Sequence, residues 1–465
     1  MLKTNEFGYA ALWCDPERTA GRRHSSRRLL VMKPMNTRST TFARGSISFP
    51  PVAFIFLLAI ISNLILALAL PRVDWAVAGE IPRIAASVAS GRGFSSPFRQ
   101  PTGPSAWSPP IYPYLLAGIF RVFGVFTVAS YWVAVAVNLI VHGFSCVVLY
   151  WVTRETFGRR TGWYAAMALA SFPILFEPLV LLHVLGQGLF IPPNFIWTTH
   201  LSELAIVLLI WFTLRQVHWA IYGTAWGIAA LINPTILALA PAFLAWRLWQ
   251  RERWRNLGLA VATAALCVTP WLVRNYLVFH RPVFIRDGFG IELRVGNQPG
   301  GKGLWSANVH PDRSDYELSR LAEMGEIEYA RVSGQEAMDT IRLRPGEFAL
   351  NTIRRIAYFW IGTPLTSRRL HALKFLKYLA QLALSLLAFY GMGCALRRGN
   401  RKALLFVSVL FFYPLVYYIT HTFFGFTYQY PIQPEMLALA ISVFIREDAT
   451  KPLEARDATG VRNTL

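Results

Sequence analysis

A series of long apolar runs constrains this chain more than any other feature, and the first run covers residues 51–70. Only Ser62 and Asn63 interrupt it with polar side chains. A helix of this length crosses the ~30 Å hydrocarbon layer of a membrane. Further candidate spans cover about residues 127–152, 162–181, 199–214, 219–249, 256–278, 372–395, 403–421 and 425–445. The pattern predicts an all-α polytopic membrane protein, because helices satisfy their own backbone hydrogen bonds in lipid.

The composition excludes the main alternatives. Only 15% of the 465 residues are charged, whereas soluble domains carry about a quarter, and 54% are hydrophobic, which also excludes disorder. A net charge of +21 would suggest nucleic-acid binding in a soluble protein, but here it fits basic cytoplasmic loops, and we expect no nucleic-acid partner. The four scattered cysteines have no CxxC spacing and predict neither a disulfide framework nor a metal cluster.

Short basic loops predict the orientation of the spans, because cytoplasmic loops carry an excess of Lys and Arg. The four loops contain Arg154, Arg159 and Arg160; Arg215 and His218; Arg247, Arg251, Arg253 and Arg255; and Arg397, Arg398, Arg401 and Lys402. Residues 219–249 lie between two of these loops, so a turn at Asn233-Pro234 must divide them into two helices. We therefore expect about ten spans, with both termini in the cytoplasm.

The predicted domains follow from this topology. They are a disordered basic cytoplasmic tail (1–49), an N-terminal transmembrane module (50–278) with a first outer loop (71–126), a small extracytoplasmic region (279–370), C-terminal transmembrane helices (371–445) and a cytoplasmic tail (446–465). The region 279–370 holds 11 of the 25 acidic residues, which is typical of a small folded domain outside the membrane.

Two carboxylates stand directly beyond the outer end of the first span, Asp74 and Glu80. A carboxylate near lipid is costly and therefore usually has a partner or a function. Pro82 disfavours a helical Ile81, so a short interfacial helix is predicted over residues 82–90, with Glu80 in the turn before it. Residue pattern alone leaves two interpretations open: Glu80 is a helix-start residue and Asp74 a solvated one, or both belong to a functional site.

Several motifs follow. Ser90-Gly91-Arg92-Gly93-Phe94-Ser95 precedes Trp107-Ser108-Pro109-Pro110-Ile111-Tyr112-Pro113-Tyr114 in the first outer loop, and Thr269-Pro270-Trp271-Leu272-Val273-Arg274-Asn275-Tyr276 closes a later span. Gly290-Ile291-Glu292-Leu293-Arg294-Val295-Gly296-Asn297 lies upstream of His310-Pro311, and Tyr428-Gln429-Tyr430-Pro431-Ile432-Gln433-Pro434 stands near the end. This order resembles the GT-C membrane glycosyltransferases, in particular the branch of protein O-mannosyltransferases, aminoarabinose transferases and RgtA/B/C/D-like sugar transferases.

The resemblance implies transfer of a sugar, of hexosyltransferase type, from a polyprenyl-phosphate donor to a hydroxyl of a glycan, lipid or protein acceptor. It implies an active site on the extracytoplasmic side of a bacterial-type inner membrane and no nucleotide cofactor, with metal dependence open. Glu80 matches the second acid of the family's acidic pair and becomes the expected base. Gly79 replaces the first acid, and Asp74 is a candidate to position the acceptor or a metal ion.

Cations must hold the departing phosphate, and the candidates are Arg83, beside the base, and Arg274. Arg274 is equally consistent with an interfacial snorkelling residue, and Asn275 with a helix cap. Tyr428, Gln429 and Tyr430 are further candidates for substrate contacts, although the two arginines of the corresponding family segment are missing.

Two histidines lie on apolar spans. His200 and Glu203 share a helix face, as half of a metal site or, as we expect, as a hydrogen-bonded pair, and we assign no metal ligand. His142 is expected to be packed among apolar side chains.

The alternative functions are a transporter or flippase of lipid-linked sugars and a non-catalytic membrane assembly subunit.

Overall fold

The computed structural model describes residues 51–69, 75, 79–176, 196–250, 254–364, 371–423 and 428–445. Backbone contacts divide the chain into two units, Met1–Ser48 and Phe49–Leu465, and the first lies outside the described residues, as does the tail 446–465. Within the described residues, the only β-type pairings are two isolated bridges, Ser95 with Pro104 and Leu304 with Thr422. The prediction of an all-α membrane protein is confirmed.

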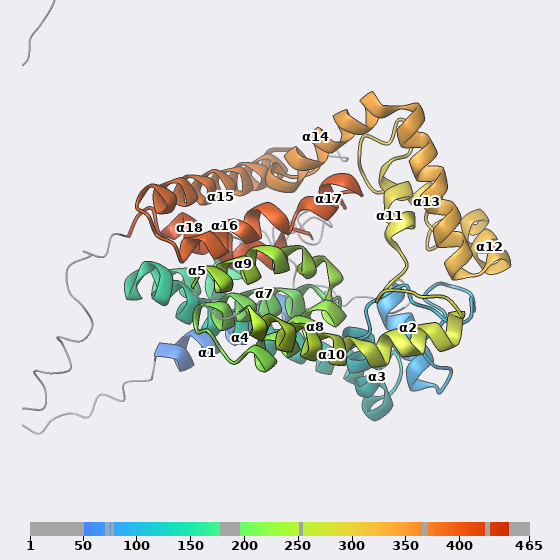
Figure 1. The fold of residues 1–465 in the computed structure, drawn as a ribbon, viewed down its shortest axis with the longest axis horizontal. Coiled ribbons are helices and arrows are strands. Elements are labelled where there is room, and N and C mark those ends of the chain that lie inside the picture. Colours follow the sequence, from blue (N-terminus) through green and yellow to red (C-terminus); the bar gives the residue numbers. More distant parts are fainter. Residues whose placement is uncertain are drawn as a thin grey trace, which may run out of the picture. The chain divides into compact units, whose positions relative to one another are not determined.

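The helices fall into three groups along the chain (Figure 1). The first group is α1 (Pro51–Ala69), α2 (Glu80–Ala89), α3 (Ile111–Phe123), α4 (Val128–Phe157), α5 (Arg159–Phe176), α7 (Thr199–Leu214), α8 (Trp219–Ile232), η2 (Pro234–Leu239), α9 (Ala240–Trp249) and α10 (Arg255–Phe279). The second is α11 (Phe289–Gly296), η3 (Ala307–Val309), α12 (Asp315–Met324), α13 (Glu326–Leu343) and α14 (Pro345–Ile361). The third is α15 (His371–Arg397), α16 (Ala403–Phe412), α17 (Leu415–Ile419), η4 (Tyr430–Ile432) and α18 (Gln433–Ile441).

Four described segments are long and apolar enough to cross a membrane: Pro51–Ala69, Val128–Phe157, Arg255–Phe279 and Tyr378–Arg397. Shorter apolar helices accompany them, among them α7, α8 and α16. Two predicted spans are less regular than expected. The span 403–421 divides into α16 and α17, and in the span 425–445 a 3₁₀ turn precedes α18. The number of crossings therefore stays a prediction.

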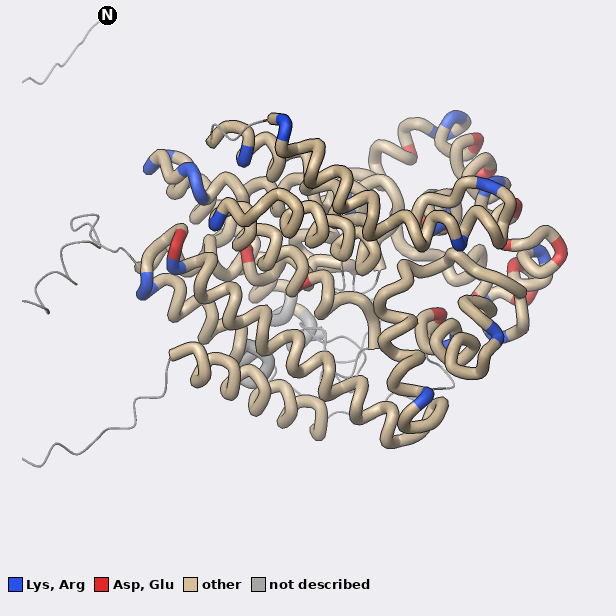
Figure 2. The backbone as a smooth tube through the Cα atoms, turned by 60° about the horizontal axis from the view of Figure 1, so that its bottom comes forward, with Lys and Arg blue, Asp and Glu red and all other residues tan. Residues whose placement is uncertain are grey.

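The described parts of the four basic loops lie together at one end of the helices. Glu155, at the end of α4, accepts Arg215 Nε at 3.0 Å and Lys402 Nζ at 3.4 Å. The Arg401 guanidinium lies 5.0 Å from the ring centre of Trp249, which follows Arg247. Figure 2 shows Lys and Arg gathered at this end, both charge signs at the other, and nearly uncharged helices between them. This distribution is what the positive-inside rule leads one to expect of a membrane protein.

The turn at Asn233-Pro234 is confirmed. Helix α8 ends at Ile232, Asn233 is extended, and its side-chain oxygen accepts the Thr235 N–H at 3.1 Å, which caps the 3₁₀ helix that follows. Pro234 occupies the first turn of that helix, where its missing N–H is not needed. The residues from Trp219 to Trp249 thus form separate helices, as their position between two basic loops requires.

The start of α2 differs from the prediction. The helix begins at Glu80 rather than at residue 82, and Ile81 is helical although Pro82 follows it. The first N–H groups of a helix have no partner within it, so a proline at the third position removes no hydrogen bond. Glu80 is consequently the first helical residue, with Gly79 as the cap, and its carboxylate lies at the positive end of the helix.

Candidate active site

A cavity of about 590 Å³ lies at the ends of α7 and α8 that are remote from the basic loops. Its walls come from all three groups of helices. The residues that line it include Trp75, Gly79–Pro82, Trp107–Pro109, Ile196–Thr199, Ser202, Ile232–Thr235, Phe284, Arg286, Phe289, Glu292, Trp305, His310, Asp312, Arg313, Tyr413, Val416, Tyr417, Thr420, His421, Phe423, Tyr428 and Pro431. Its volume is that of sites for small ligands, which are about 300–1,000 Å³.

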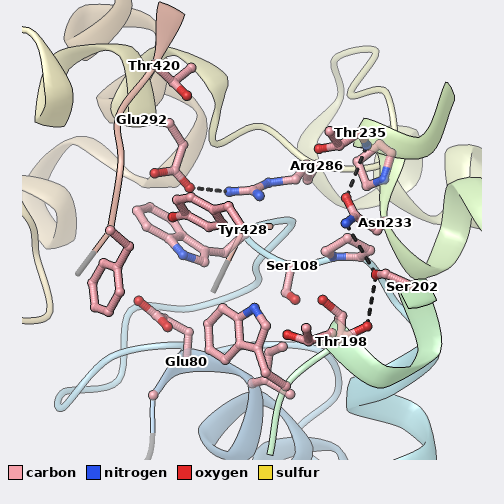
Figure 3. A pocket seen from close by; sticks show the side chains of 18 of the residues that line it. Glu80, Ser108, Thr198, Ser202, Asn233, Thr235, Arg286, Glu292, Thr420 and Tyr428 are labelled. Atoms are coloured by element: carbon pink, nitrogen blue, oxygen red, sulfur yellow. Dashed lines mark hydrogen bonds and ion pairs between the residues drawn. The ribbon is translucent and has the colours of Figure 1, made fainter. Parts of the chain in front are cut away.

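Glu80 enters this cavity from the start of α2 (Figure 3). Its side chain is only 12% exposed, and its carboxylate oxygen lies 3.8 Å from Nε2 of His310. Burial, helped by the negative charges of Asp312 and Glu292, raises the pKa of Glu80 to about 7. Burial also lowers the pKa of His310. At neutral pH Glu80 is therefore about half ionised, and it can both release and accept a proton there.

The cavity also contains a cation that the sequence analysis did not single out, Arg286. Its guanidinium donates to Glu292 at 2.8 Å, as the dashed line in Figure 3 marks. Burial opposes ionisation of Glu292, but the charges of His421 and Arg286 hold the pKa of Glu292 below its ordinary value. Nδ1 of His421 lies 3.4 Å from Glu292, and its Nε2 lies 2.7 Å from the Tyr428 hydroxyl. A charged guanidinium thus faces the cavity at one end of a connected polar chain.

Aromatic rings form much of the remaining wall. Tyr428 stacks on Tyr417 with ring centres 4.3 Å apart and planes 17° apart. The Trp305 ring lies 5.2 Å from that of His310, and Trp107 lies 5.6 Å from it on another side. Such faces suit a sugar ring or a lipid chain, because both present apolar C–H surface. The cavity therefore combines a carboxyl group, a guanidinium and apolar walls.

The other predicted arginines lie elsewhere. Arg83 pairs with Asp312 at 2.5 Å and also reaches the Pro97 carbonyl, so it binds a lining residue without being among the lining residues described. Arg274 donates to the carbonyl oxygens of Phe94 and Ser105 at 2.8 and 2.7 Å. It therefore ties the first outer loop to α10. Their predicted role in phosphate binding stays untested.

Of the five remaining predicted residues, four have described positions. Asn275 is buried and donates to the Val283 carbonyl at 3.2 Å, away from the described cavity wall. Gln429 is buried and bonds Gln381. Tyr430 points into a separate buried cluster with His142. Of the three predicted residues in this segment, only Tyr428 lines the cavity. Asp74 lies outside the described residues.

Further residues of the cavity differ in how well the amino-acid sequence indicates them. Glu292 and His310 belong to motifs that carry the resemblance, and the predicted topology already places His310 and His421 on the outer side, where the site is expected. Arg286 follows α10 in an irregular segment, and no local pattern distinguishes it from other basic residues of the outer region. Its place in the cavity follows from the path of residues 280–292 back to the first outer loop, where the Asp287 N–H bonds the Ala106 carbonyl at 3.3 Å.

The comparison with protein families agrees with the resemblance. Residues 107–273 match the dolichyl-phosphate-mannose-protein mannosyltransferase family. No curated protein sequence matches the chain. Among solved structures, the archaeal oligosaccharyltransferase AglB of Archaeoglobus fulgidus, in complex with an inhibitory peptide and a dolichol-phosphate, is similar with a TM-score of 0.44 and 16% identity over 89% of this chain and 52% of that chain.

The apo form of the same Archaeoglobus fulgidus enzyme gives a TM-score of 0.46 at 16% identity, over 89% of this chain and 52% of that chain. ArnT of Cupriavidus metallidurans, bound to undecaprenyl phosphate, gives a TM-score of 0.35 at 16% identity, over 84% of this chain and 77% of that chain. The present chain spans about half the length of the archaeal enzyme.

Proposed function

We propose that the chain transfers a sugar from a polyprenyl-phosphate donor to an acceptor hydroxyl, and the family match over residues 107–273 supports this proposal. The reaction takes place in the cavity that Glu80 and Arg286 line. The acceptor is a hydroxyl of a glycan, lipid or protein. The membrane is a bacterial-type inner membrane, with the cavity on the side opposite the basic loops.

One observation carries the proposal: a carboxyl group whose pKa is raised to about 7 by burial lines the same cavity as a guanidinium. A general base works best when its pKa is near the working pH. A phosphate leaving group needs a cation, and guanidinium groups bind phosphate through charge-assisted hydrogen bonds. Arg286 lines the cavity whereas Arg83 and Arg274 do not, which favours Arg286 for this role.

The proposed reaction is a single displacement. The acceptor oxygen attacks the anomeric carbon and forms the new C–O bond, while its proton passes to the Glu80 carboxylate. The bond between the anomeric carbon and the phosphate oxygen breaks, and the electron pair leaves with the lipid phosphate, which Arg286 stabilises. Attack on the face opposite the phosphate inverts the anomeric configuration. Apolar side chains of the lining, among them Ile196, Trp197 and Phe284, receive the start of the polyprenyl chain.

The test uses the purified full chain in lipid nanodiscs, a panel of polyprenyl-phosphate sugars and membrane extract as acceptor. The wild-type chain should transfer label from at least one donor, with a rate that rises as the pH passes about 7, because Glu80 then ionises. Glu80→Gln should lower the rate by about 10²- to 10⁴-fold. Glu323→Gln, which changes an exposed acid of α12, is the matched control and should leave the rate unchanged.

A transporter or flippase would give a different result. Glu80→Gln would then leave transfer unaltered and change the flux of lipid-linked sugar across vesicle membranes. A folded wild-type chain that transfers no sugar from any donor would reject the transferase and favour the transporter or the assembly subunit.

A further inference from the structure

A second group of polar side chains lies behind the cavity wall, buried among apolar helices. His142 and Cys146 come from α4, His200 and Glu203 from α7, and Tyr430 from η4. Each of them is at most 4% exposed. None is among the described residues that line the cavity, and the proposed transfer reaction uses none of them. Ionisable groups inside a membrane bundle are costly and usually functional.

The atoms of this group converge on one point. Nδ1 of His142 lies 3.2 Å from Oε2 of Glu203, and Nδ1 of His200 lies 3.8 Å from the same oxygen. The Tyr430 hydroxyl lies 3.3 Å from both Nδ1 atoms. Ligands at 2.0–2.1 Å from a tetrahedral zinc ion are about 3.3 Å apart. Four of the six separations between these atoms are therefore 3.2–3.8 Å, near the edge length of such a tetrahedron, and the ligand atoms of the two histidines and Glu203 all lie within 4.8 Å of one another.

We propose that this cluster is a structural Zn²⁺ site, with His142 Nδ1, His200 Nδ1, Glu203 Oε2 and Tyr430 Oη as ligands. Two imidazoles and a carboxylate are an established zinc ligand set. On binding, the Tyr430 phenol loses its proton to solvent, so the carboxylate and the phenolate balance the charge of the dication. A neutral site suits a surrounding of low dielectric constant, where an unbalanced charge is expensive.

The surroundings of His142 and Glu203 agree with this assignment. Sγ of Cys146 lies 3.6 Å from Nε2 of His142, so the ring nitrogen that faces away from the metal has an acceptor for its proton. Metal-bound histidines usually donate their other N–H in this way, which sets the tautomer. Glu203 is fully buried, and its other oxygen, Oε1, has no hydrogen-bond partner in the described residues. A carboxylate so placed needs a neighbouring cation.

The position suggests what the metal does. Thr199 and Ser202 of α7 line the cavity, and His200 and Glu203 occupy the neighbouring positions of the same turns. Pro431, next to Tyr430, also lines the cavity. A metal bound to α4, α7 and η4 would therefore fix the wall of the active site from behind. The proposal does not depend on the transfer reaction.

The experiment measures metal in the full chain, purified in nanodiscs after growth with added zinc and dialysed. We expect about one zinc per chain and a thermal midpoint that falls when a strong chelator removes it. Glu203→Gln and His200→Gln should lose the zinc and melt at one temperature with or without chelator. His280→Gln, which removes an exposed histidine at the end of α10, is the matched control and should keep the zinc.

Cobalt provides a readout that needs no variant to fold. The wild-type chain loaded with Co²⁺ in place of zinc should absorb with the strong visible bands of a four-coordinate ion. Two results would overturn the proposal. One is a folded wild-type chain with far less than one equivalent of zinc and no cobalt bands, which would make the cluster an ion pair of Glu203 with His142. The other is zinc that both variants retain.

Discussion

At the scale of single residues, Glu80 and Arg286 differ in what sets their properties. Glu80 lies at the positive end of α2, which favours its ionised form, yet burial in the cavity outweighs this and raises its pKa to about 7. Arg286 is held by Glu292, 2.8 Å away, and carries the positive charge to the cavity wall. One group is kept near its point of ionisation, and the other is kept charged.

The raised pKa of Glu80 predicts a pH-dependent stability. The folded state holds the proton up to about pH 7 and the unfolded state only up to the ordinary value of 4.5, so stability present below pH 4.5 is lost as the pH rises through 7. Glu80→Gln cannot ionise and should be more stable than wild type at pH 8 by about 3 kcal/mol.

Thermal melts at several pH values check this expectation. The two midpoints should converge below pH 4.5, where the wild-type carboxyl is protonated in both states. Glu323→Gln, on the surface, should follow wild type throughout. A Glu80→Gln chain that melts below wild type at pH 8 would contradict the burial of this carboxyl.

Arg286→Gln should weaken use of the donor. Loss of a hydrogen bond between charged groups costs about 1.5–3 kcal/mol, so kcat/KM for the polyprenyl-phosphate sugar should fall about 10- to 100-fold. Arg281→Gln removes a guanidinium that is 60% exposed and should leave kcat/KM unchanged. Steady-state kinetics with varied donor decide the question, and equal loss in both variants would argue against a specific role.

At the scale of elements, the contact of α8 with α10 sets the position of two cavity segments. An added Cβ at Gly223 of α8 would lie 2.0 Å from the Ala260 carbonyl oxygen of α10, so the backbones approach as closely as small residues permit. Helix α8 leads into the turn at Asn233, and α10 carries Arg274, which binds the first outer loop. The positions of Asn233 and of the first outer loop, which both line the cavity, therefore depend on this packing.

Gly223→Ala should therefore separate the two helices and cost about 1–3 kcal/mol. Gly258→Ala, in α10, is the matched control, because a Cβ there meets nothing within 4 Å. This control should be neutral or stabilising by up to about 1 kcal/mol, since alanine favours helix. Thermal unfolding in nanodiscs measures both changes, and equal midpoints would show that the close approach does not matter.

At the scale of the whole described molecule, Arg355 joins the outer region to the C-terminal helices. This fully buried arginine of α14 donates to the carbonyl oxygens of Gly296, Gly303, Tyr418 and Ile419 at 2.9–3.3 Å. Burial lowers its pKa to about 10, which still leaves it charged at neutral pH. Glu292, His310 and His421 reach the cavity from the segments that this arginine holds together.

Arg355→Ala should cost about 3 kcal/mol or more, because several buried carbonyl groups lose their donor. Hydrogen exchange should rise in residues 296–304 and 415–422 while α4 and α10 stay protected. Arg354→Ala is the matched control, since that side chain is partly exposed and bonds Asn351 within its own helix. Unchanged exchange in the Arg355 variant would remove the proposed link.

Much of this fold is predictable from the amino-acid sequence alone. Apolar runs and basic loops predict the helices, the common side of the loops and the turn at Asn233, because membrane insertion obeys local rules of length and charge. The effect of proline on the preceding residue places the start of α2 two residues too late. Pro82 is a boundary signal in general, but the first helical turn tolerates it.

Local patterns also make Glu80 and Asp74 candidates, because carboxyl groups beside a membrane span are rare enough to notice. They do not identify Arg286, Glu292 and His421 as neighbours of Glu80 in the cavity, nor do they bring His142 beside His200 and Tyr430. These contacts join segments between about 60 and 340 residues apart. Proximity over such distances follows from how helices pack, and no periodicity along the chain encodes it.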